Sequence, residues 1–93
     1  MWGGLTGRMS TKKIKATATA AKIEFSANGC HTLEIQNNGS SAVYIGDSTV
    51  TTSNGIKINA GSSKIMPVNS FLDGNLYIVS SSDNDVIVAD YSS

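Results

Sequence analysis

The chain has 93 residues and a mass of 9.7 kDa, which is enough for one compact domain. Seven basic residues balance seven acidic ones, which argues against a dedicated nucleic-acid binder, because such domains are strongly basic. Only 15% of the residues are charged, and most of the polarity comes from 14 Ser, 8 Thr, 8 Asn and 9 Gly, which favour turns and strand surfaces. No apolar run approaches membrane-spanning length and no secretory signal is visible, so we expect no membrane partner.

The charge is divided unevenly along the chain. Residues 1–22 hold five basic residues and no acid, whereas residues 23–93 hold two basic and seven acidic residues. This asymmetry is typical of a basic tail that binds an acidic partner, although a solvated leader gives the same pattern. Because the Gly-rich start has no periodicity, we expect residues 1–13 to form an extended basic N-terminal arm. The residues expected to bind a partner are Trp2, Leu5, Arg8, Lys12 and Lys13.

The start of this arm has two interpretations. Translation could begin at Met1 or at Met9, and the second choice would leave residues 1–8 outside the natural chain. In either case the arm is expected to be dispensable for folding, so that a chain without residues 1–13 would still fold but would bind its partner less well.

From residue 14 onward the sequence has a period of two, which is typical of strands with one buried face. Apolar and polar residues alternate over residues 14–20 and 22–26, where β-branched Thr and Ile favour a strand over an Ala-rich helix. The Asn28-Gly29 turn then leads into a third alternating segment at residues 31–36.

Further short apolar segments follow at residues 42–46, 56–59, 63–68, 76–80 and 85–91, separated by turn residues. Pro67 lacks a backbone donor and therefore belongs at a sheet edge or at a strand end. The pattern predicts an all-β fold, a small antiparallel β-sandwich of about seven short strands over residues 14–93. Its expected core consists of Ile23, Phe25, Leu33, Ile35, Val43, Ile45, Ile58, Leu76, Ile78, Val86 and Val88.

The residue types needed for catalysis are scarce. His31 is the only histidine and Cys30 the only cysteine, and neighbouring residues on a strand point to opposite faces, so the two cannot act as a thiolate–imidazole pair. Two such residues are also too few for a zinc site, and Asp83-Asn84-Asp85 lacks the spacing of a calcium loop. The sequence therefore predicts a protein that is not an enzyme, with no catalytic residue, no cofactor and no metal.

Two tyrosines are candidates for a binding surface. Tyr44 and Tyr77 stand beside expected core positions, so both are expected to face outward. There they could stack on a sugar or fill a protein interface, or they could pack across strands on the solvated face.

The stretch from Asn37 to Gly61, NNGSSAVYIGDSTVTTSNGIKINAG, carries a recurrent order of short elements. An N-x-G turn leads into V-Y-I-G, then a V-T pair, then G-hydrophobic-x-hydrophobic-x-x-G. An L-Y-hydrophobic strand, a Ser-rich acidic loop and a V-x-V strand follow at residues 76–78, 80–85 and 86–88. This order resembles small virion proteins of tailed bacteriophages, and the resemblance covers roughly residues 16–91.

The resemblance implies a β-sandwich structural piece of a phage particle. The matched residues are architectural, with Gly39, Gly46, Gly55 and Gly61 expected at turns and Val43, Ile45 and Ile58 in the core. We therefore expect a capsid decoration (cement) protein on the capsid exterior, made in the cytoplasm of the bacterial host. Its expected partners are the major capsid protein or another virion protein and further copies of itself, most simply as a homotrimer, with no nucleic acid.

A second function stays open, namely a carbohydrate-binding or adhesin-type domain of a head or tail fibre. Tyr44, Tyr77 and Tyr91 gathered on one face would favour this alternative, because exposed tyrosines stack on sugar rings.

Overall fold

The computed structural model describes residues 8–24, 30–67 and 75–92. In this part of the chain there are strands and turns and no helix, which confirms the all-β expectation. The eight strands are β1 (Arg8–Ala16), β2 (Ala21–Lys22), β3 (Cys30–Asn37), β4 (Val43–Gly46), β5 (Ile56–Ile58), β6 (Ser63–Pro67), β7 (Tyr77–Ser80) and β8 (Asn84–Ser92).

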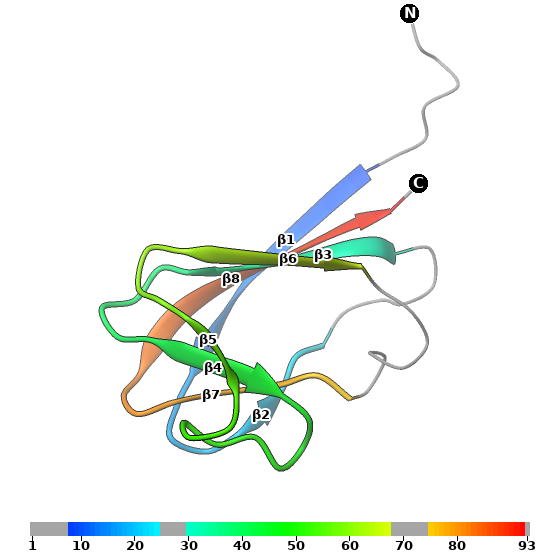
Figure 1. The fold of residues 1–93 in the computed structure, drawn as a ribbon. Helices are drawn as coiled ribbons and strands as arrows, with labels where there is room; N and C mark the ends of the chain where they lie inside the picture. The colour runs from blue at the N-terminus through cyan, green and yellow to red at the C-terminus, as the bar shows by residue number, and fades with distance from the viewer. Residues whose placement is uncertain (1–7, 25–29, 68–74, 93) are drawn as a thin grey trace, which may run out of the picture.

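The strands form two four-stranded antiparallel sheets that face each other (Figure 1). Sheet A has the order β1-β8-β3-β6 and sheet B has the order β2-β7-β4-β5, so most connections cross from one sheet to the other. This interleaved order is that of a jelly roll, an eight-stranded form of the predicted antiparallel sandwich. The arrangement places β1 and β6 at the edges of sheet A, and β2 and β5 at the edges of sheet B.

Strand β1 begins six residues earlier than the sandwich was expected to begin. Arg8–Ala16 pairs with β8 without a register shift, from Arg8 opposite Ser92 to Ala16 opposite Asn84. Residues 8–13, which the sequence assigned to the arm, are thus backbone-paired members of sheet A. The sequence did not predict a strand here, because R-M-S-T-K-K has no apolar face. The segment is a strand because its backbone pairs with β8.

The end of β1 also differs from the expected strand over residues 14–20. Ala16 is fully buried, but the strand stops there, and residues 17–20 carry the chain across to sheet B. The carbonyl of Thr17 still accepts a hydrogen bond from the Ser80 amide at 2.8 Å, and Ala18 is exposed. The alternation of Ala and Thr therefore continues past the point at which the strand ends.

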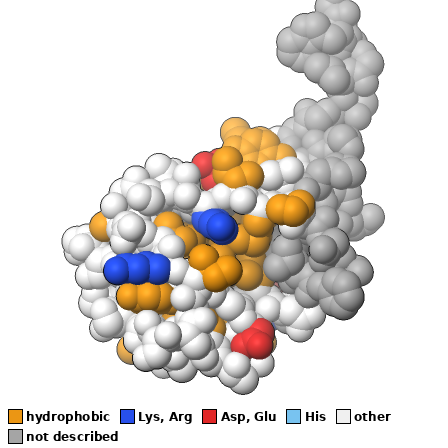
Figure 2. All heavy atoms as spheres, in the orientation of Figure 1, with side chains coloured by type: hydrophobic (Ala, Val, Ile, Leu, Met, Phe, Trp, Pro, Cys, Tyr) orange, Lys and Arg blue, Asp and Glu red, His pale blue; other side chains and the backbone are white. Residues whose placement is uncertain are grey.

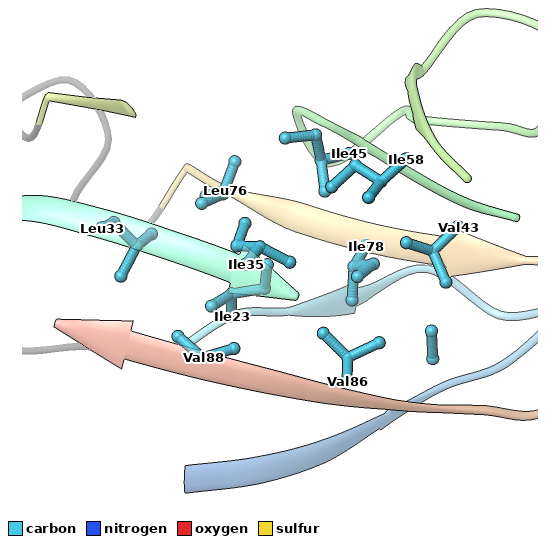
Figure 3. Packing of buried hydrophobic residues seen from close by; sticks show 11 residues of the cluster. Ile23, Leu33, Ile35, Val43, Ile45, Ile58, Leu76, Ile78, Val86 and Val88 are labelled. Atoms are coloured by element: carbon cyan, nitrogen blue, oxygen red, sulfur yellow. The ribbon is translucent and has the colours of Figure 1, made fainter. Parts of the chain in front are cut away.

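The hydrophobic core lies between the two sheets (Figure 3). Ten of the eleven residues expected in the core are buried, and the eleventh, Phe25, lies outside the described residues. The view shows side chains from β3 and β8 meeting those from β4 and β7. The confirmed members are Ile23, Leu33, Ile35, Val43, Ile45, Ile58, Leu76, Ile78, Val86 and Val88, and Ala16 joins them.

A buried polar network connects the sheets beside this core. Asn37 at the end of β3 donates from Nδ2 to the Ser41 and Ile58 carbonyls at 2.7 and 3.1 Å, and its Oδ1 accepts from the Gly39 amide at 2.9 Å. Asn84 at the start of β8 donates to Ser80 Oγ at 2.7 Å. Because Asn37 and Asn84 belong to sheet A while Ile58 and Ser80 belong to sheet B, these bonds cross the sandwich.

The same network explains the glycine of the N-x-G turn. A Cβ at position 39 would overlap the side-chain amide of Asn84, so the backbone can approach this closely only as glycine. Gly61 is needed for a different reason, because its φ of 80° is a left-handed conformation that other residues avoid.

Candidate functional site

The predicted partner-binding residues are only partly placed by the structure. Trp2 and Leu5 lie outside the described residues, and Arg8 is described only by its backbone, as the first residue of β1. Lys12 and Lys13 are exposed on β1, opposite Val88 and Ile87 of β8. Because successive side chains of a strand point to opposite faces, these two lysines do not share one patch.

Lys12 and Lys13 do, however, lie on the same edge strand of sheet A. Strand β1 carries Arg8, Lys12, Lys13 and Lys15 and no acidic residue, and it pairs with β8 on one side only. Lys15 approaches Asp85 at 3.9 Å, but both side chains are about half exposed, so this ion pair adds little stability. Lysines on an edge strand oppose uncontrolled pairing with other chains, and they favour a partner that brings acidic groups.

Large hydrophobic side chains also reach the surface at the sheet edges. Met9 on β1, Ile56 on β5 and Ile65 on β6 are exposed by 57%, 54% and 63%. All three belong to edge strands. Figure 2 shows hydrophobic side chains gathered near the middle of the visible face, with Lys or Arg side chains among them. Exposed apolar groups on sheet edges are candidates for protein contacts.

The tyrosines divide between the two sheets. Tyr44 on β4 and Tyr77 on β7 are partly exposed, and the alternation with buried Ile45 and Ile78 places both on the outer face of sheet B. Tyr91 lies on β8 in sheet A. The three tyrosines therefore do not gather on one face, which was the feature expected of a fibre-tip adhesin.

Tyr91 is held by an acid on the neighbouring strand. Its hydroxyl donates a hydrogen bond to Glu34 Oε1 at 2.8 Å. The bond to this carboxylate raises the pKa of Tyr91 above the ordinary value of 10.0, because it favours the neutral phenol.

A hollow of about 350 Å³ lies at the end of β4. Its lining comes from β4, from the loop of residues 47–55 and from the start of β5. In Figure 1 this loop projects from the end of sheet B at which β4 ends and β7 begins. The lining residues are Ile45, Gly46, Asp47, Thr49, Val50, Asn54 and Ile56.

Two polar side chains of this hollow are fixed by the loop itself. Asp47 Oδ1 accepts hydrogen bonds from the Thr49 amide at 2.9 Å and from Thr49 Oγ1 at 2.6 Å. These bonds, led by the one from the hydroxyl, hold the pKa of Asp47 below its usual value of 3.8. Asn54 Oδ1 accepts from the Thr51 amide at 2.7 Å. In the sequence, residues 47–55 show turn residues at both ends, and Asp and Asn side chains commonly bond nearby backbone amides in turns, but the pattern did not mark a site here.

The other candidates from the sequence are not brought into a site. Cys30 and His31 begin β3, where the pairing with β8 shifts register before Thr32, and their side chains lie outside the described part. Asn84 belongs to the buried network and Asp85 faces Lys15. Among the described residues, no three His, Cys, Asp or Glu side chains come together as a metal site would require.

Comparison with known proteins identifies the fold and not a family. No protein-family model matches the sequence, and no curated protein matches it as a relative. The structure is similar to that of a protein described as "Bacillus endospore appendages form a novel family of disulfide-linked pili", with a TM-score of 0.52 and 17% sequence identity. The match covers 95% of this chain and 87% of the other. No helix that could cross a membrane occurs over residues 8–24, 30–67 and 75–92.

Proposed function

We propose that this chain is a non-enzymatic structural subunit of an ordered protein assembly. The observation that carries the proposal is the similarity in fold between this jelly roll and a protein described as forming pili. Jelly rolls are common in viral capsids, where rigid sandwiches associate through their surfaces. The single His and single Cys of the sequence support a role without nucleophilic or metal chemistry.

The charge distribution gives this assembly a physical basis. Residues 1–22 carry a net charge of +5, and residues 23–93 carry −5 (two basic minus seven acidic residues). The basic segment of one copy can therefore bind the acidic body of the next copy or of a neighbouring shell protein. Met9 and Ile65 add exposed apolar surface at the two edges of sheet A. A contact between unlike surfaces closes into a ring where the rotation permits, and three copies give the homotrimer.

In this proposal, the assembly lies on the exterior of a tailed-phage capsid. Support comes from the resemblance of residues 16–91 to small phage virion proteins, which belong to shell decoration and to fibres. On a shell, many weak contacts repeated by symmetry would add up to strong attachment.

Covalent cross-linking of the kind named for the pilus protein is limited in this chain. Cys30 is its only cysteine, so intermolecular disulfides within residues 1–93 could join copies in pairs and could not continue along a filament. Disulfides alone therefore cannot hold the proposed assembly together.

Mixing with phage particles tests the proposal. The full chain is incubated with purified empty shells from the phage that encodes it, and the shells are sedimented and imaged by electron microscopy. We expect the chain to sediment with the shells and to appear as regular density on their exterior. Recovery of all the protein in the supernatant, with bare shells in the images, would refute the decoration role.

A further inference from the structure

We propose that the hollow beside β4 is a binding site for a neutral saccharide, and that it takes one sugar ring. The hollow is separate from β1 and from the edges of sheet A, so this site does not depend on the proposed assembly. Its volume of about 350 Å³ lies at the lower end of the range of small-molecule sites, which suits a ligand of one ring.

The apolar part of the lining matches the C–H face of a pyranose. Ile56 is 54% exposed, which is unusual for an isoleucine on a strand whose neighbour Ile58 is buried at 3%. Ile45 stands opposite Ile56 in the pairing of β4 with β5, but it is only 1% exposed, so Ile56 supplies the apolar surface that a ligand can touch. One exposed aliphatic side chain beside a few fixed polar groups can contact a ligand that has one apolar face and several hydroxyls.

The polar part offers a matched acceptor and donor. Asp47 uses Oδ1 for both bonds to Thr49, which leaves Oδ2 as an acceptor. Asn54 uses Oδ1 for the Thr51 amide, which leaves its Nδ2 as a donor. A sugar hydroxyl donates and accepts at once, so neighbouring hydroxyls can bond the carboxylate and the amide together.

Both groups are held in place before any ligand binds. The Thr49 bonds fix the carboxylate. The Thr51 bond fixes the amide. Side chains that are already ordered lose less conformational entropy on binding, which favours a weakly held ligand such as a single sugar.

The composition of the hollow disfavours other ligand classes. Asp47 is the only charged residue in its lining, so an anion would meet a like charge with no cation to offset it. A calcium ion needs six to eight oxygen ligands, and one carboxylate with one amide and one threonine falls short of that. A neutral polyhydroxy ligand avoids both penalties.

Nuclear magnetic resonance of the isotope-labelled full chain tests this site. The methyl glycosides of glucose, galactose, N-acetylglucosamine and rhamnose are titrated separately to millimolar concentrations. We expect at least one of them to shift the amide signals of residues 46–56 in a saturable manner. Asp47→Ala and Asn54→Ala should each weaken the binding about tenfold or more, the loss expected for a hydrogen bond to a charged or fixed group.

The matched control is Asp83→Ala, because Asp83 is an exposed acid in the loop between β7 and β8, at the other end of sheet B. It should bind as the unchanged protein does, and the spectra of all variants outside residues 46–56 serve as the test of folding. The proposal is overturned if no glycoside shifts these signals, if the shifts map to Tyr44 and Tyr77 instead, or if Asp47→Ala and Asn54→Ala bind as well as the control. A response to calcium chloride alone would overturn it in favour of a cation site.

Discussion

Three buried polar side chains determine how the two sheets are held at one end of the sandwich. Asn37 and Ser80 are fully buried and Asn84 is 2% exposed, yet no buried side-chain nitrogen or oxygen among the described residues lacks a partner. Ser80 Oγ continues the network to the Ala42 carbonyl at 2.8 Å. Satisfied networks of this kind fix one arrangement of a core, because removing any member leaves the others unpaired in a dry environment.

Asn37 takes part in three bonds of this network. Replacement by Ala leaves the carbonyls of Ser41 and Ile58 and the amide of Gly39 without these hydrogen-bond partners. Asn37→Ala should therefore lower the free energy of unfolding by roughly 2–4 kcal/mol. Urea denaturation measures this change. The control is Asn38→Ala, an exposed neighbour whose loss should cost less than about 0.5 kcal/mol. Equal values for both variants would show that the network does not hold the sheets.

The titration of Tyr91 gives another prediction. Its folded pKa lies above 10.0 because the phenol bonds Glu34, so the stability from this bond is present below pH 10 and is lost as the pH rises through the folded pKa. Glu34→Gln should lower the pKa of Tyr91, because the carboxylate that favours the neutral phenol is removed. Ultraviolet absorbance of the phenolate follows this titration, and Tyr91→Phe identifies its signal. An unchanged midpoint in Glu34→Gln would contradict the assignment.

Within each strand, the alternation of side chains determines which of them stabilise the fold by packing in the core. In β3, Ile35 is fully buried, whereas Ile65 on the adjacent β6 faces outward and is 63% exposed. Ile35→Ala should therefore cost roughly 2–5 kcal/mol and Ile65→Ala less than about 0.5 kcal/mol. Thermal or urea unfolding compares the two. The reverse ranking would mean that the strand faces are inverted, as a register shift of one residue would produce.

Strand β1 changes what a truncation is expected to do. A chain without residues 1–7 keeps all nine pairs between β1 and β8, so its stability should stay close to that of the full chain. Deletion of residues 1–13 removes six of these nine pairs and uncovers one edge of β8. The truncated chain should therefore lose a sizeable part of its free energy of unfolding, which is roughly 5–15 kcal/mol for a domain. If both truncations unfold at the same urea concentration, residues 8–13 do not contribute to the sheet.

For the molecule as a whole, the fold class and the core residues could be predicted from the sequence. Period-two alternation marks buried strand faces directly, as at Leu33, Ile35, Val43 and Ile45. The order of the strands could not be predicted, because the pairs between β1 and β8 join residues 68 to 84 positions apart and leave no local pattern. The hollow was missed for a related reason: Asp47, Asn54 and Ile56 are unremarkable alone, and only the loop brings them together.

Sedimentation equilibrium of the full chain at low and high salt tests whether copies of this protein associate. We expect a species of several copies that dissociates as salt screens the attraction between residues 1–22 and residues 23–93. Charge reversal by Lys12→Glu with Lys13→Glu should weaken this association, whereas Lys57→Glu on β5 should leave it intact. A monomer at every concentration and salt condition would show that this protein does not associate with itself.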